Sequence, residues 1–134
     1  RGCSIMSENF KIEIISPEKK ILTQEITSVT LPAFEGDITI LYNHIPLITF
    51  LRPGIIIIND DEKLQYFVED GTVEFSNNSL SLLTSTIHEL KKLSKEQIDK
   101  IISESKDKLN EPNLNDKKRY TISHKIDCLS RVNL

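Results

Sequence analysis

Short runs of hydrophobic residues, separated by turn-forming residues, fill about the first 86 positions of the chain. In residues 10–14, apolar and polar side chains alternate strictly, which is the period of a strand with one buried face. Comparable runs rich in Ile, Leu, Val, Thr and Phe recur up to residue 84, at a spacing typical of β-sandwiches. This pattern predicts an antiparallel β-sandwich of about ten short strands.

Turn residues mark where the predicted strands end. At Pro53-Gly54, a glycine after a proline suits a type II turn, in which the third residue needs a positive φ. Asp70-Gly71 is a two-residue hairpin signal. We also expect turns at residues 16–19 and 76–79, and a polar hairpin tip at residues 59–62.

The hydrophobic period becomes helical after the last predicted strand. Ser94 and Gln97 stand at the positions of a capping box, and Leu93 and Ile98 stand at those of a hydrophobic staple. Lysine and glutamate fill the polar face of this helix. Its apolar face consists of Ile98, Ile101, Ile102 and Leu109.

A second helix follows after a short connection. Asn110 and Pro112 end the first helix near residue 110, and residues 114–116 can open the next one. Because short connections make neighbouring helices antiparallel, we predict a helical hairpin over residues 94–133. The apolar side chains of the second helix are Ile122, Ile126, Leu129 and Val132.

The apolar stripe on each helix is narrow. Two such helices bury little when they pair alone, so the hairpin needs to dock on something larger. An element of this kind can rest in more than one position, which is what a switch requires. We therefore predict an α+β protein, with a sandwich domain at residues 6–90 and a hairpin domain at residues 91–134.

Charge is distributed unevenly along the 134 residues. The net charge of −3 argues against a nucleic-acid binder and against a basic membrane-surface protein. Residues 1–112 hold 12 Lys and Arg against 18 Asp and Glu, whereas residues 113–134 hold 5 against 2. A basic tail on an acidic body predicts that the tail docks on that body or binds an acidic partner. The alternative is that the basic residues form an ordinary solvated helix face. The basic residues of the tail are Lys117, Lys118, Arg119, Lys125 and Arg131.

The two cysteines, Cys3 and Cys128, lie near opposite ends of the chain and outside any zinc-like spacing, so we expect free thiols. The five residues before Met6 are interpreted as a processed extension or an expression remnant. No apolar stretch approaches the length that spans a bilayer.

Candidate chemistry is sparse. Asp37 and His44 stand seven residues apart, with Glu35 close by, and a carboxylate and a histidine can form an acid–base pair. The chain has no nucleophile motif, no HExxH and no dense carboxylate cluster, so surface polarity or protein recognition explains these residues better than catalysis. His88 lies at the junction of sandwich and hairpin and His124 on the second helix, and we expect each to face solvent or lie on a helix surface and not to be a ligand. The four glycines are scattered, so no phosphate-binding loop is predicted.

Residues 31–58 resemble a known family. They contain, in order, Leu-Pro, Glu-Gly-Asp, Ile-Leu, Asn-His-x-Pro-Leu and Pro-Gly-Ile. This order is similar to that of the epsilon subunit of bacterial F-type ATP synthases, whose mitochondrial counterpart is called delta. The resemblance implies a non-catalytic rotor subunit in which the sandwich joins the gamma subunit to the ring of c subunits. That rotor couples proton translocation to ATP synthesis.

The resemblance also implies particular contacts. Asp37 and His44 match the positions of the family's acid and histidine that face the c ring. In many members the hairpin extends toward the alpha and beta subunits and restrains ATP hydrolysis, which implies a beta contact for Lys117, Lys118 and Arg119. The implied location is peripheral, on the cytoplasmic side of a bacterial inner membrane, with membrane association only through the complex.

One departure concerns nucleotide binding. Some members bind ATP through Ile/Leu-Asp-x-x-Arg-Ala on the first helix, but this chain has Ile102 where that arginine would stand. We therefore expect no cofactor. Two alternatives to the rotor subunit remain. They are a free-standing β-sandwich binding module with a basic helical tail, and a small hydrolase that uses Asp37 and His44.

Overall fold

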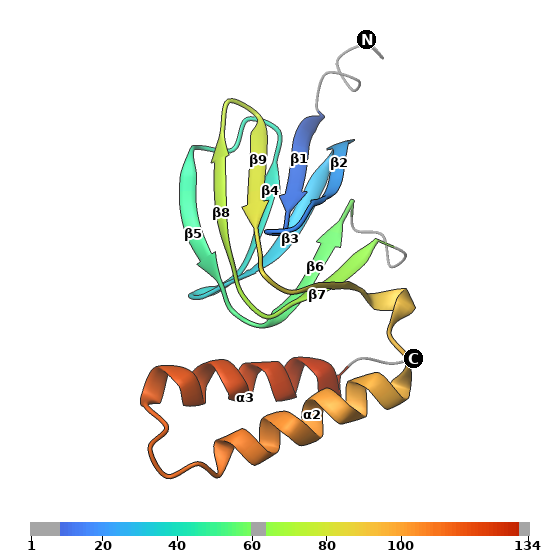
Figure 1. Cartoon of the computed structure of the whole chain (residues 1–134). Coiled ribbons are helices and arrows are strands. Elements are labelled where there is room, and N and C mark those ends of the chain that lie inside the picture. Colours follow the sequence, from blue (N-terminus) through green and yellow to red (C-terminus); the bar gives the residue numbers. More distant parts are fainter. Residues whose placement is uncertain (1–8, 60–63, 132–134) are drawn as a thin grey trace.

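The structure is a computed structural model that describes residues 9–59 and 64–131 (Figure 1). Most of the predicted hairpin tip at residues 59–62 lies outside the described residues, as do Cys3, Met6 and Val132. Within the described residues, ten strands precede a 3-10 turn and two α-helices, which confirms the predicted fold class. They are β1 (Phe10–Ile15), β2 (Lys20–Ile26), β3 (Ser28–Ala33), β4 (Gly36–Leu41), β5 (Leu47–Leu51), β6 (Gly54–Ile58), β7 (Gln65–Val68), β8 (Gly71–Ser76), β9 (Ser79–Leu83), β10 (Ile87–Glu89), η1 (Leu90–Lys92), α2 (Lys95–Leu109) and α3 (Asp116–Ser130).

The strands form two layers that face each other (Figure 1). One layer has the order β4-β3-β6-β7-β10, and the other has the order β5-β8-β9-β1-β2. The layers join at one corner, where Ala33 of β3 pairs with Leu51 of β5. Neighbouring described strands run antiparallel, except that β1 and β9 run parallel. The hydrogen-bonded sheet is therefore continuous but folded on itself as a sandwich.

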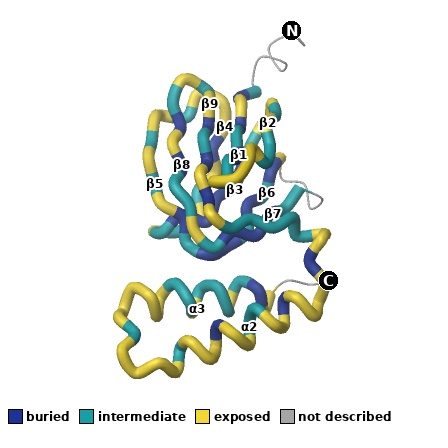
Figure 2. Tube along the Cα trace, viewed as in Figure 1, coloured by how far each residue is buried: buried dark blue, intermediate teal, exposed yellow. Residues whose placement is uncertain are grey.

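The main core lies between the two layers, where buried positions concentrate in Figure 2. Strand β6 illustrates how the sequence specifies it, because Ile56 and Ile58 are buried while Ile55 and Ile57 between them are half-buried. Alternate residues of a strand point to opposite faces, so one face of each strand enters the core. The largest fully buried side chains of this core are Phe10, Phe75, Ile12, Ile14, Ile26, Leu31, Ile40, Ile56, Ile58, Leu80 and Leu82.

Two of the turn predictions are wrong. Gly54 does not have a positive φ, and it begins β6 instead of completing a type II turn. A Cβ added to Gly54 would lie 2.4 Å from Cβ of Pro32, so glycine is needed there for a close approach of two strands. Asp70-Gly71 does not close a hairpin, because β7 pairs with β6 and β10 whereas β8 pairs with β5 and β9. The chain crosses between layers at this point.

The predicted turn at residues 76–79 is confirmed. It joins β8 to β9, with Ser76 opposite Ser79. Asn77 and Asn78 both have positive φ values, of 51° and 56°. Two consecutive residues of this kind make the tight turn whose twist suits a β-hairpin, and asparagine tolerates that conformation better than most residues.

The helix boundaries follow the predicted caps. The backbone N–H of Gln97 donates to Ser94 Oγ at 3.2 Å, and the backbone N–H of Ser94 donates to Gln97 Oε1 at 2.9 Å. This is the predicted capping box. Helix α2 ends at Leu109, and α3 begins after Asn115, whose side chain accepts a hydrogen bond from the Lys118 N–H at 2.8 Å.

The two helices lie side by side beneath one end of the sandwich (Figure 1). A second apolar cluster joins them to it, and its buried members are Phe67, Leu93, Ile98 and Leu129. Leu93 and Ile98, the predicted staple residues, are both part of this cluster. Among the described residues, no helix is long and apolar enough to cross a membrane.

Candidate functional site

Asp37 and His44 lie at opposite ends of β4. Asp37 pairs in register with Pro32 at the end of the sandwich that faces the hairpin, whereas His44 follows Leu41 at the far end. The stretch from Asp37 to Leu41 alone spans about 14 Å at about 3.4 Å per residue. The structure therefore does not bring the two side chains together, and a hydrolase that uses them as an acid–base pair is ruled out.

Asp37 borders a cleft between the sandwich and α3. Its carboxylate Oδ1 lies 3.2 Å from Nη2 of Arg52, and its side chain is 68% exposed. The cleft has a volume of about 750 Å³ and is lined also by His124 and Arg131 of the hairpin. The Asp37 carboxylate is thus accessible to a partner, whereas the Arg52 side chain with which it pairs is only 17% exposed.

His44 belongs to a loop that is fixed at the opposite end of the sandwich. Its Nδ1–H donates to the Ile45 carbonyl at 2.8 Å, and its ring lies edge-on to Phe75 at a centroid distance of 6.0 Å. The preceding Asn43 donates its backbone N–H to Asn78 Oδ1 at 2.6 Å, and Asn78 Nδ2 donates back to Asn43 Oδ1 at 3.0 Å. This asparagine pair holds the His44 loop against the β8–β9 turn. Local sequence patterns could not predict this pair, because the two asparagines are 35 positions apart.

One end of the outer face of the second layer carries exposed apolar residues. Ile48 and Phe50 on β5 are 70% and 62% exposed, and Leu83 on β9 is 52% exposed. In the strand register, Phe50 stands beside Thr72, Thr72 beside Leu83, and Leu83 beside Ile15. This row crosses four strands and continues into a groove of about 740 Å³ that Lys117 and Thr121 of α3 also line. We call Ile48, Phe50 and Leu83 the outer apolar face.

An apolar face of this kind marks an interaction site. Single exposed hydrophobic residues are ordinary, but three close together on one sheet face, with β8 between their two strands, form a patch that water solvates poorly. The signal that could have revealed it is the composition of β5, Leu-Ile-Thr-Phe-Leu, which has apolar residues on both faces. A strand with one solvated face is expected to alternate with polar residues instead.

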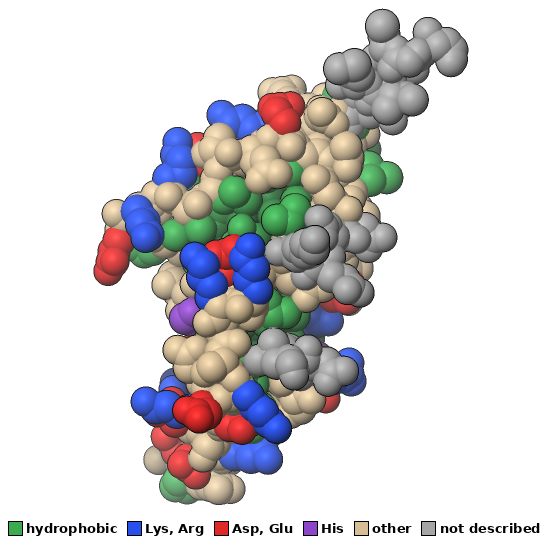
Figure 3. Space-filling view, turned by 90° about the vertical axis from the view of Figure 1, so that its right-hand side faces the viewer, with side chains coloured by type: hydrophobic (Ala, Val, Ile, Leu, Met, Phe, Trp, Pro, Cys, Tyr) green, Lys and Arg blue, Asp and Glu red, His purple; other side chains and the backbone are tan. Residues whose placement is uncertain are grey.

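The basic residues of α3 have different surroundings. Lys117, Lys118 and Arg119 are exposed, as expected for a solvated face or for residues that await a partner. Lys125 instead contacts the sandwich, with its Nζ 2.6 Å from Oε1 of Glu69. Over the hairpin, basic and acidic side chains mix on the face seen in Figure 3. One basic side chain of this helix therefore pairs with the protein's own surface, whereas the three near its start face solvent.

The two other histidines both lie at the boundary between the sandwich and the hairpin. His124 is half-buried between α3 and the sandwich, with its ring 4.3 Å from that of Tyr120. Loss of hydration, followed by the positive charge of Arg52, lowers the pKa of His124, whereas Asp127 raises it by a smaller amount. His88 is also half-buried and stacks on Phe67 at a centroid distance of 6.4 Å. For His88 its position in the sequence already indicated this boundary, whereas for His124 helix periodicity could not reveal it.

The described residues offer little for metal or covalent chemistry. Among them, no group of three or more His, Cys, Asp or Glu side chains is placed to hold a metal ion. The Cys128 thiol is free, and burial raises its pKa to about 11. Because the thiolate is the reactive form, this cysteine is protonated and inert near neutral pH. The surfaces of this part of the chain are suited to contact with other macromolecules.

Known proteins match this chain over nearly its whole length. The family model described as ATP synthase, Delta/Epsilon chain, beta-sandwich domain matches residues 9–89. An ATP synthase epsilon chain from Pelagibacter ubique is 45% identical over 130 residues, which cover 96% of this chain and 100% of that protein. One from Rhizobium johnstonii is 29% identical over 115 residues, which cover 84% of this chain and 85% of that protein.

Solved structures share the fold. A chain in the Euglena gracilis mitochondrial ATP synthase, in a structure comprising OSCP, F1 and the c-ring, matches with a TM-score of 0.71 and 18% identity, over 91% of this chain and 78% of that chain. A chain in the central stalk and c-ring of the Tetrahymena thermophila mitochondrial ATP synthase matches with a TM-score of 0.63 and 14% identity, over 90% of this chain and 93% of that chain. At these identities the likeness establishes the fold.

Proposed function

Because the chain belongs to the ATP synthase epsilon family, we propose that it is a non-catalytic subunit of the rotor, joining the gamma subunit to the c ring. In this role it couples proton translocation through the ring to ATP synthesis. It is peripheral to a bacterial inner membrane, on the cytoplasmic side, and associates with that membrane only through the complex. The free-standing binding module loses its support, because the relatives matched over most of their length are ATP synthase epsilon chains.

The observation that carries this proposal is the outer apolar face. Ile48, Phe50 and Leu83 project from a sheet whose other side is anchored in the main core, so the face is held in a fixed shape. Burying one such side chain contributes about 1.5–3 kcal/mol. A few large apolar anchors at the centre of an interface supply most of its affinity. We assign this face to the gamma subunit.

We place the c ring along β4. This strand pairs with β3 alone among the described strands, and Asp37, Thr39 and Leu41 on one of its faces are exposed. A contact that involves both Asp37 and His44 must extend along the whole strand, because the two lie at its opposite ends. The c-ring surface is therefore proposed as a line from Asp37 to His44.

The hairpin is proposed to act on the alpha and beta subunits. Lys117, Lys118 and Arg119 are exposed near the start of α3, where they are accessible to an acidic beta surface. Such a contact would require the hairpin to leave the sandwich or the head to approach it. Complementary charge across this contact would determine which surface is recognised, and added salt would weaken it.

The gamma assignment is tested by reconstitution with gamma and a c ring. The double variant I48E/F50E should lose co-purification with gamma, because two carboxylates would have to be buried in the interface. Thr23→Glu is the matched control, since Thr23 is an exposed residue of β2 in the same layer. If I48E/F50E is folded by circular dichroism and still binds gamma as tightly as T23E does, the outer apolar face is not the docking surface.

A further inference from the structure

The second apolar cluster attaches only one half of the hairpin. Its helical members, buried and half-buried, are Ile98, Ile101 and Ile102 in the first two turns of α2, and Cys128 and Leu129 near the end of α3. In an antiparallel hairpin these segments lie together next to the η1 connector (Figure 1). The other half of α3, from Asp116 to Lys125, is thus outside this cluster.

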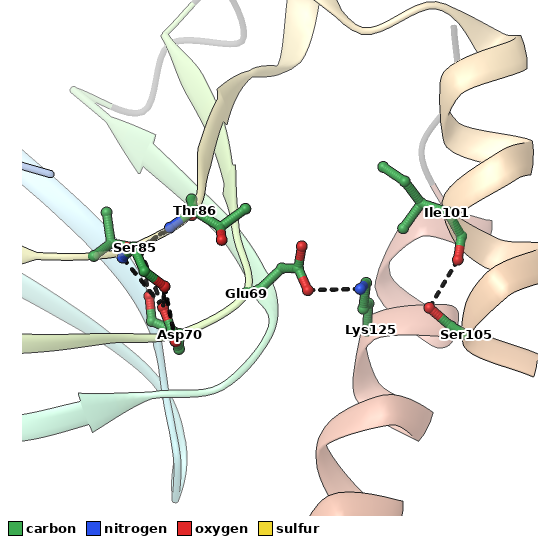
Figure 4. Close-up of polar contacts among 8 residues, drawn as sticks. Glu69, Asp70, Ser85, Thr86, Ile101, Ser105 and Lys125 are labelled. Atoms are coloured by element: carbon green, nitrogen blue, oxygen red, sulfur yellow. Dashed lines mark hydrogen bonds and ion pairs between the residues drawn. The ribbon is translucent and has the colours of Figure 1, made fainter. Parts of the chain in front are cut away.

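Polar contacts hold that other half. Tyr120 donates its hydroxyl to the Phe34 carbonyl at 2.9 Å, and the two aromatic rings lie 5.2 Å apart. Lys125 binds Glu69 at 2.6 Å, with side chains that are only 15% and 33% exposed (Figure 4). The contacts reach two different turns of the sandwich, β3–β4 and β7–β8.

The turn that carries Glu69 is itself fixed. Thr84 Oγ1 donates to the Asp70 carbonyl at 2.7 Å, and Ser85 Oγ lies 3.0 and 3.1 Å from the two Asp70 carboxylate oxygens. Figure 4 shows this network next to Glu69 on the sandwich side. These hydrogen bonds fix the backbone next to Glu69, and the Lys125–Glu69 pair is itself only partly exposed, so solvent and salt screen it less than a pair between two free surface chains.

We propose that Tyr120 and Lys125 form a polar latch that keeps the hairpin docked on the sandwich. The proposal deepens the inhibitory role given under Proposed function, because an undocked hairpin is the one able to reach another subunit. Lys125 takes part in either state. In the docked state Glu69 neutralises it, and on undocking its ammonium becomes available to an acidic partner. Glu69 thus acts as the internal competitor of such a partner.

The latch can be tested on the full chain with its own cysteine as the probe. With Cys3 replaced by Ser, Cys128 is the remaining thiol, and it is half-buried in the second cluster. Its rate of reaction with a thiol reagent at fixed pH reports the undocked population, because docking shields it. Rates are divided by those measured in urea, so that any effect of a substitution on the thiol itself is removed.

Breaking the latch should raise this rate. We expect an increase of roughly fivefold to thirtyfold for Lys125→Met and for Glu69→Gln, and of about twofold to tenfold for Tyr120→Phe. Lys106→Met, at an exposed lysine of α2 in the same hairpin, should leave the rate unchanged. The double variant E69Q/K125M should exceed neither single variant by much, because both substitutions break the same pair. Raising the salt to 1 M should accelerate labelling of the parent chain but not of K125M.

Two results would overturn the latch. One is a labelling rate for K125M equal to that for K106M. The other is a loss of hydrogen-exchange protection in β8 and β9 of K125M that equals its loss in α3, because Lys125 would then support the whole fold. Binding of gamma is a separate measurement on the same variants. Its failure in the parent chain would contradict the proposed function and leave the latch result unaffected.

Discussion

Replacing Phe67 by Ala should separate the docking of the hairpin from the stability of the sandwich. Phe67 lies on β7 and is fully buried, but it belongs to the second cluster, whereas its neighbours Tyr66 and Val68 belong to the main core. Its ring is covered by the hairpin. The cost of Phe67→Ala should therefore depend on whether the hairpin is present.

The magnitudes follow from burial. Truncating a buried phenylalanine to alanine costs about 3–5 kcal/mol. In the full chain, Phe67→Ala should lower the free energy of unfolding by up to that amount. The loss cannot exceed the free energy with which the hairpin docks, because a hairpin that detaches no longer covers position 67. In a chain that ends after Leu90, which retains all ten described strands, Phe67 is already uncovered. There the substitution should change the free energy of unfolding by no more than about 1 kcal/mol.

Phe75 provides the matched control. It is the same residue type, is 1% exposed, and packs edge-on against Phe10 in the main core at 5.5 Å. Phe75→Ala should cost about 3–5 kcal/mol in both the full and the shortened chain. Urea unfolding followed by circular dichroism gives the four differences. An equal loss from Phe67→Ala in both chains would refute the reasoning, because Phe67 would then support the sandwich itself.

Three further predictions concern single residues. Asp37→Ala should change the free energy of unfolding by less than about 1 kcal/mol while weakening attachment to the c ring, and a clear drop in melting temperature would make Asp37 structural. Because loss of hydration and Arg52 lower the pKa of His124 in the docked state, the contribution of neutral His124 to docking should be fully present above pH 6.5, the ordinary value, and should be lost as the pH falls through the docked-state pKa. His124→Gln should remove that pH dependence of Cys128 labelling. Gly54→Ala should destabilise the sandwich by about 1–3 kcal/mol in urea unfolding, because Pro32 occupies the space a methyl group needs, and a neutral effect would contradict the close approach.

Most of the fold could be predicted from local sequence patterns. The strands were predictable because one-sided burial forces a period of two, and the helix ends were predictable because Ser94, Gln97 and Asn115 cap neighbouring backbone groups. The errors occur where the outcome depends on distant residues. A glycine is needed at position 54 because Pro32 of the neighbouring strand lies so close. Whether Asp70-Gly71 closes a hairpin depends on which strands pair.

The candidate sites depended almost entirely on distant contacts. The resemblance gave Asp37 and His44 together, but only the pairing of β3 with β4 shows that they lie at opposite strand ends. Lys125 and Glu69 are 56 positions apart, so helix periodicity could assign Lys125 to a basic face without revealing its partner. The charge distribution left two alternatives for the basic tail, docking on the chain's own acidic body or binding an acidic partner. The Lys125–Glu69 ion pair is a contact of the first kind.

The two apolar clusters suit two mechanical tasks. A subunit that transmits torque must keep its docking surface rigid, and the outer apolar face stands on strands whose inner residues form the large, closely packed core. The hairpin, if regulatory as proposed, must instead be held with a free energy small enough to be overcome, and its attachment is correspondingly small: four buried residues and two polar contacts. Strengthening the second cluster would therefore favour one position of the hairpin at the expense of the other, because a switch needs two states within a few kcal/mol.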